Sequence, residues 1–179
     1  MSEIPADARR RLFFAIWPTD ELRRHIEEAT VGPARHSGGH VVPARNFHVT
    51  LAFVGDVPQP QLNAALAAGG MTSAPHFTMV LDQIEAWPRS NVLVLNAPRT
   101  PPGLVTLVDH LLFNLLEKQI KLKREVYKPH VTLVRNLPSL RPSQKIAPFE
   151  WPVTEFALVE SSLDADEAKY TVLARWPLT

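Results

Sequence analysis

The same tetrapeptide occurs twice in the chain, and its residue types are suited to proton transfer. His48-Val49-Thr50-Leu51 and His130-Val131-Thr132-Leu133 are identical, and their β-branched residues favour the extended conformation. Because successive side chains of a strand point to opposite faces, the imidazole and the hydroxyl of each copy share one face. The repeat therefore predicts two similar strands, each with a histidine and a threonine on one side and an apolar surface on the other.

Two imidazoles that share one site are suited to the hydrolysis of a phosphodiester. One must deprotonate the attacking water while the other protonates the leaving alkoxide, and an unperturbed pKa near 6.5 allows a histidine to do either. The hydroxyls of Thr50 and Thr132 can donate to the non-bridging oxygens of the phosphate. Arg135, five residues after His130, adds a cation at the same site. The spacing does not decide whether His48 or His130 is the acid.

Strands and helices follow one another around the two motifs. The hydrophobic periodicity and the turn residues predict strands at 11–17, 47–54, 76–87, 91–96, 129–135, 154–163 and 169–176. Helices are predicted at 20–29, 60–68 and 102–120, with a loop at 32–40 and a basic connector at 121–128.

The order of these elements repeats. Residues 13–58 and 92–138 each run strand, turn, helix, motif strand and turn. We interpret this as an internal duplication within a single bilobal domain, 1–179, in which two lobes are related by a pseudo-twofold axis. The mixture of antiparallel strands and helices predicts an α+β fold, with outer helices and an active-site cleft between the lobes.

The composition excludes several classes of protein. The chain has 179 residues and no cysteine, which rules out disulfides, thiolate metal sites and a cysteine nucleophile. No segment approaches the ~18 apolar residues of a membrane helix, and the polar N-terminus lacks a secretory-type apolar run. We therefore expect a cytoplasmic protein. A net charge of +1 argues against a non-specific nucleic-acid coat but allows a local basic patch for one small anion.

The paired His-x-Thr motifs resemble those of the two-histidine (2H) phosphoesterase superfamily. The likeness is greater to its RNA 2′,3′-cyclic phosphodiesterase branch, formerly called 2′-5′ RNA ligase, and it extends over residues 11–16, 46–55, 129–135, 161–162 and 170–173. It implies that the enzyme opens a terminal 2′,3′-cyclic phosphate of RNA to a 2′-phosphate without a metal or other cofactor. It also implies that His48 is the proton donor to the leaving 3′-oxygen and that His130 is the proton acceptor that activates water.

Other residues are candidates for substrate contacts. Tyr170 and Phe14 are candidates for stacking on a base, with Phe53 as a further aromatic near the first motif. The basic connector supplies possible contacts to the RNA backbone at Lys121, Lys123, Arg124 and Lys128. The expected partners are RNA ends or small 2′,3′-cyclic nucleotides. We expect a monomer with no obligate protein partner and no membrane association.

Three alternatives remain open at this stage. The histidines could be metal ligands, although two are too few for a closed site and no neighbouring His-x-x-Glu or Asp cluster completes one. The site could bind an RNA end without turning it over. The third alternative stays within the resembled family, as 2′-5′ RNA ligase activity or the reverse cleavage.

Overall fold

The computed structural model describes residues 9–122, 126–139, 141–164 and 167–179, and it confirms a mixed α+β fold. The strands are β1 (Arg10–Ile16), β2 (His40–Val41), β3 (Val49–Val57), β4 (Phe77–Trp87), β5 (Val92–Asn96), β6 (His130–Arg135), β7 (Gln144–Val153), β8 (Glu155–Asp164) and β9 (Glu167–Pro177). The helices are α1 (Asp20–Arg35), α2 (Gln59–Met71) and α3 (Pro102–Glu117), with a short 3-10 helix η1 (Ala44–Asn46).

Within the described residues these strands form one antiparallel sheet in the order β7-β4-β5-β6-β3-β1-β8-β9, and β2 pairs with β6. The two motif strands, β6 and β3, lie at the middle of this order. Their ladder is short, with Val49 opposite Val131 as its register pair. The eight strands of this order therefore divide into two four-stranded parts that meet where the two motifs lie side by side.

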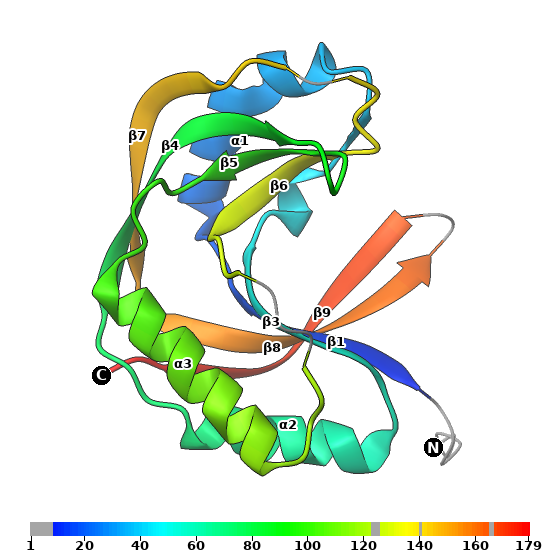
Figure 1. The fold of residues 1–179 in the computed structure, drawn as a ribbon, viewed down its shortest axis with the longest axis vertical. Helices are drawn as coiled ribbons and strands as arrows, with labels where there is room; N and C mark the ends of the chain where they lie inside the picture. The colour runs from blue at the N-terminus through cyan, green and yellow to red at the C-terminus, as the bar shows by residue number, and fades with distance from the viewer. Residues whose placement is uncertain (1–8, 123–125, 140, 165–166) are drawn as a thin grey trace.

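We call β1, β3, β8 and β9, with α2 and α3, the first lobe. The second lobe consists of β2 and β4 to β7, with α1 (Figure 1). The helices cross between the lobes: α1 follows β1 in the chain but packs against β6 and β7, while α3 follows β5 but packs against α2 and β3. From the junction outward, each lobe has a motif strand, the strand that precedes the helix of the other lobe, and two further strands. This arrangement is what a pseudo-twofold axis produces, while the internal duplication itself stays a prediction.

The core confirms the predicted alternation of the motif strands. Val49, Leu51, Val131 and Leu133 are at most 3% exposed, whereas the histidine and threonine of each motif are only partly buried. The helix face of the sheet therefore holds the aliphatic side chains. We call the opposite face, which carries both His-x-Thr pairs, the histidine face.

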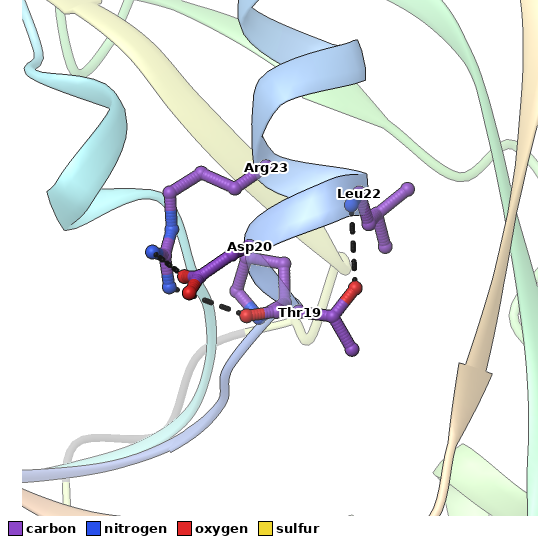
Figure 2. A network of polar contacts seen from close by, with 5 residues as sticks. Thr19, Asp20, Leu22 and Arg23 are labelled. Atoms are coloured by element: carbon purple, nitrogen blue, oxygen red, sulfur yellow. Dashed lines mark hydrogen bonds and ion pairs between the residues drawn. The ribbon is translucent and has the colours of Figure 1, made fainter.

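The start of α1 is fixed by a local polar network that follows β1 directly (Figure 2). The hydroxyl of Thr19 accepts from the backbone N–H of Leu22 at 3.2 Å, which caps the helix. The guanidinium of Arg23 donates to Asp20 at 2.6 Å and to the carbonyl of Pro18 at 3.2 Å. These three bonds hold the turn that connects β1 to α1.

Two elements differ most from the sequence prediction, beside the short β2 and η1, which the sequence does not predict. The helix predicted to end near residue 29 continues to Arg35 through Pro33, so the segment predicted as a loop is half helical. It continues because Thr30 and Ala34 are buried against the second lobe, and packing outweighs the cost of a proline in the last turn. Strand β7 was not predicted because it contains Pro148 and Pro152, which are tolerated at a sheet edge, where β7 lies.

Candidate active site

The pairing of the motif strands brings the two histidines to one place on the histidine face. Val49 lies opposite Val131 in an antiparallel register, and this register puts His48 across from Thr132 and His130 across from Thr50. The two histidines interact electrostatically, since His130 contributes to lowering the pKa of His48. The site is therefore formed at the junction of the lobes, with one His-x-Thr pair from each.

A bulge in each motif strand brings a third residue to the same face. The β1–β3 register shifts between Phe14 and Ala15, and the β5–β6 register shifts between Leu93 and Val94. Two consecutive residues after each motif threonine are consequently buried, and the next side chain returns to the histidine face. That residue is Phe53 in the first lobe and Arg135 in the second. Simple alternation would place both on the opposite face.

The imidazole of His48 is oriented by two hydrogen bonds. Its Nδ1 lies 2.7 Å from the carbonyl oxygen of Asn46, so Nδ1 carries a proton and donates. Its Nε2 lies 3.1 Å from the hydroxyl of Thr50. In the neutral ring the hydroxyl donates to Nε2, and in the charged ring Nε2 donates to the hydroxyl. Nε2 is therefore the nitrogen that gains or loses a proton at this site.

Aromatic rings enclose His48 on several sides. Trp17 stacks on it at 5.3 Å and 5° between planes, Tyr170 meets it edge-on at 5.3 Å, and Phe13 lies 4.9 Å away. Burial is the main cause that lowers the pKa of His48 to about 4; the bond to the Asn46 carbonyl opposes it, and the charges of Arg135 and His130 act in the same direction as burial. His48 is thus neutral at pH 7 in the ligand-free protein.

His130 has the same backbone contact but different neighbours. Its Nδ1 donates to the carbonyl oxygen of Lys128 at 2.8 Å, which again leaves Nε2 as the reactive nitrogen. Trp87 packs against it at 4.5 Å and 58° between planes, and the ammonium of Lys128 lies 5.8 Å from the centre of the Trp87 ring. Burial lowers the pKa of His130, and Arg135 adds to the effect. Both imidazoles are therefore neutral at pH 7, and Nε2 is the unprotonated nitrogen of each ring.

The structure corrects the expectation for Phe14. Its side chain is 0% exposed and packs with Phe156 and Trp176 on the helix face of the sheet, so it cannot contact a substrate. Phe13, its neighbour in the chain, lies on the histidine face instead. Alternation along β1 contained this signal, because Phe13, Ala15 and Trp17 share one parity and Phe14 has the other.

The other predicted contacts are distributed unevenly around the site. Tyr170 lies against His48, as described above, and Phe53 is 62% exposed next to Phe13. In the basic connector, Lys128 adjoins the His130 site, whereas Lys123 and Arg124 lie outside the described residues.

Two tryptophans that the sequence analysis did not single out pack on the two histidines. Trp17 directly follows β1 and Trp87 ends β4, and each precedes a proline. Each has the parity of the residues that face the site, which is the signal that would have identified it.

Among the described residues, no group of three or more His, Cys, Asp or Glu side chains could hold a metal ion. The helices in the described part of the chain are also too short or too polar to cross a membrane.

Two His-x-Thr strands at the junction of two antiparallel lobes define a two-histidine phosphoesterase type of site. The model of the 2′-5′ RNA ligase superfamily matches residues 18–165, and the chain belongs to this family. The chain is 34% identical to the RNA 2′,3′-cyclic phosphodiesterase of Escherichia coli, over 95% of this chain and 97% of that protein. It is 31% identical to the protein of the same name from Thermus thermophilus, over 94% of this chain and 90% of that protein.

Solved structures show the same fold. The crystal structure of E. coli LigT in its apo form has a TM-score of 0.84 and 33% identity, covering 97% of this chain and 99% of that chain. The complex of E. coli LigT with 3′-AMP gives a TM-score of 0.84 at 34% identity, covering 96% and 99%. TT0787 of T. thermophilus gives 0.79 at 30% identity, covering 93% and 97%.

Proposed function

We propose that this protein is an RNA 2′,3′-cyclic phosphodiesterase that opens a terminal 2′,3′-cyclic phosphate to a 2′-phosphate by two-histidine acid–base catalysis. The observation that carries the proposal is the matched geometry of the two imidazoles. In each, Nδ1 is bonded to the carbonyl oxygen of the residue two positions earlier, at 2.7 Å for His48 and 2.8 Å for His130. This leaves the two Nε2 atoms as the nitrogens that can exchange a proton, with Nε2 of His48 also in contact with the Thr50 hydroxyl. The names of the E. coli and T. thermophilus relatives support the same substrate class.

In the proposed reaction, Nε2 of His130 accepts a proton from water as the water oxygen bonds to phosphorus. The bond between phosphorus and the 3′-oxygen breaks, and Nε2 of His48 gives its proton to that oxygen. The 2′-oxygen keeps the phosphate. The hydroxyls of Thr50 and Thr132 donate to the non-bridging oxygens, and Arg135 offsets their negative charge.

The assigned donor must acquire a proton before it acts. The pKa of His48 is about 4 without ligand, so at neutral pH its Nε2 is bare. A phosphodiester anion at the site favours the charged imidazole, which raises this pKa toward the working pH. The Thr50 hydroxyl accommodates either state, because it can donate to Nε2 or accept from it. We therefore propose that substrate binding raises the pKa of His48, so that its Nε2 takes up the catalytic proton from solvent.

RNA ends and small 2′,3′-cyclic nucleotides are the proposed substrates, and a 2′-5′ ligase activity is the second candidate. The family name favours that candidate. The 3′-AMP complex of E. coli LigT supports a mononucleotide as a ligand that this kind of site accepts.

The test is turnover of a nucleoside 2′,3′-cyclic phosphate in excess EDTA by the wild type and by His130→Ala, with the product identified by phosphorus NMR. We expect a 2′-phosphate from the wild type and a loss of at least about a hundredfold in the variant. Absence of wild-type turnover, with binding retained, would support a binding module instead. Activity that EDTA abolishes and a divalent metal restores would contradict metal-independent chemistry.

A further inference from the structure

A pocket of about 300 Å³ lies beside His130 in the second lobe. It is formed by β4, β5 and the segment that leads into β6, and its lining includes Glu85, Asn96 and Tyr127. In the sheet, Gln83 lies opposite Asn96 and Asn96 lies opposite His130. Because residues opposite each other in a sheet share a face, the pocket is a lateral extension of the histidine face.

The carboxylate of Glu85 is held in this pocket before any ligand binds. The indole N–H of Trp87 and the amide of Asn96 donate to its Oε2 at 2.9 and 2.7 Å. Both bonds end on the same oxygen, and a carboxylate accepts about four hydrogen bonds. Glu85 therefore keeps acceptor capacity in a fixed orientation, next to a site that we assign to an anionic phosphate.

Two further polar atoms of the lining residues are buried without a hydrogen-bond partner among the described residues. They are Oδ1 of Asn96 and the hydroxyl of Tyr127. Burial raises the pKa of Tyr127, so its hydroxyl is neutral and able to donate or accept. Buried polar groups in folded proteins are normally bonded. A polar ligand in this pocket is one way to complete these bonds.

The pocket is lined by one carboxylate, Glu85, and one ammonium, Lys128, which lies over the Trp87 ring at 5.8 Å. The fixed acceptor at Glu85, rather than the net charge, therefore indicates the class of ligand, because it favours a group that presents N–H donors. Among the four RNA bases, only guanine presents two adjacent donor groups on its pairing edge, N1–H and the N2 amino group. Its O6 then requires a donor, which the hydroxyl of Tyr127 can supply. A volume near 300 Å³ is at the small end of ligand sites and fits one base.

We propose that this pocket binds the guanine base of the nucleotide whose cyclic phosphate lies at the two histidines, with Glu85 as the specificity residue. Trp87 connects the two places, because its ring packs on His130 at 4.5 Å and also lines the pocket. A nucleotide whose phosphate lies at the histidines can therefore reach the pocket with its base. This inference rests on the proposed function for the identity of the phosphate group.

The test compares kcat/KM for the 2′,3′-cyclic phosphates of guanosine, adenosine, cytidine and uridine. We expect the wild type to prefer the guanosine substrate by about tenfold or more, which is the usual effect of one bidentate contact to a base. Glu85→Gln should bring the guanosine-to-adenosine ratio close to one, because an amide has one acceptor oxygen, which cannot accept from Trp87, Asn96 and both N–H groups of guanine at once. Glu150→Gln, an exposed carboxylate of the same lobe on β7, should leave the ratio unchanged.

Equilibrium binding of guanosine and adenosine 2′-monophosphate, measured by calorimetry, gives a second reading that needs no turnover. Selective binding of the guanosine product without turnover would support the pocket and refute the proposed function. Turnover of all four substrates at equal kcat/KM would support the proposed function and refute the guanine pocket. A Glu85→Gln variant that melts like the wild type but keeps the guanosine preference would overturn the role of Glu85.

Discussion

The first lobe surrounds its histidine with aromatic rings, whereas the second lobe surrounds its histidine with polar and charged groups. Trp17, Tyr170 and Phe13 enclose His48. On the other side, Lys128 and the Glu85 pocket adjoin His130, and among the described ring contacts Trp87 alone packs on it. The backbones of the two strands nevertheless hold both imidazoles in the same way, by a carbonyl on Nδ1.

The bulge position shows the same contrast. The residue that follows each bulge returns to the histidine face, and it is Phe53 in one lobe and Arg135 in the other. Two equivalent positions thus supply an apolar ring and a cation. In the proposed mechanism, the repeated backbone therefore defines where two protons move, while the flanking side chains decide what each half of the substrate meets.

Removal of either imidazole should have the largest effect. His48→Ala and His130→Ala should each lower kcat by about 10² to 10⁴, because each removes one proton-transfer group. His25→Ala, at an exposed position on α1, is the matched control and should retain activity. A histidine variant with normal activity would remove that lobe from the mechanism. Steady-state kinetics, with a thermal melt to verify folding, makes the comparison.

The pH dependence of kcat/KM should reflect the lowered pKa values of both histidines. The productive free enzyme has one protonated and one neutral imidazole, and its fraction is greatest between the two pKa values. The pKa of His48 is about 4 and that of His130 lies below its usual value. The optimum should therefore be below pH 6.5, the ordinary histidine value, with a fall of nearly tenfold per unit on the alkaline side. A profile that rises above neutral pH would contradict these shifts.

The two threonines should behave differently despite their equivalent positions. Thr50→Val removes the hydrogen bond to Nε2 of His48, so it should change both the pKa of His48 and kcat, the latter by about tenfold. Among the described contacts, Thr132 has no such bond to His130, so Thr132→Val should lower kcat while leaving the pKa of His130 unchanged. NMR titration of the two imidazoles measures the difference. Equal pKa changes in both lobes would refute the asymmetry.

The smallest effects should come from removing a tyrosine hydroxyl in each lobe. The hydroxyl of Tyr127 is buried with no partner among the described residues, so Tyr127→Phe should stabilise the protein, by up to about 1 kcal/mol. Tyr170→Phe keeps the ring that packs on His48 and should leave stability unchanged. Urea denaturation of the two variants tests this. A large loss of stability in Tyr127→Phe would show a hydrogen bond that the pocket conceals.

The sequence was sufficient to predict the two motif strands, because an identical tetrapeptide with strict alternation fixes which side chains share a face. The helices were also predictable from their periodicity, although α1 extends through Pro33 because of contacts with the second lobe, and such contacts leave no local signal. Strand β7 depends on pairing with β4 and has little strand character of its own.

The flanking groups were harder to predict, since they come from strands far away in the chain. The sequence prediction names Phe14 as a substrate contact, whereas Phe13 is the residue that faces the site, although the parity of β1 distinguishes the two. The bulge that turns Arg135 to the histidine face depends on pairing with β5 and cannot be read from the motif alone. Likewise, Glu85 on β4 and His130 on β6 belong to the same region of the sheet because β5 pairs with both strands.

Replacing the leaving 3′-oxygen by sulfur would distinguish the proton donor from the proton acceptor. A nucleoside 2′,3′-cyclic phosphorothiolate with a bridging 3′-sulfur releases a thiolate, which needs no proton from the enzyme. We predict that His48→Ala approaches the wild-type rate on this substrate, whereas His130→Ala stays inactive because water still requires a base. Rescue of His130→Ala alone would reverse the two roles, and rescue of neither would contradict His48 as the proton donor.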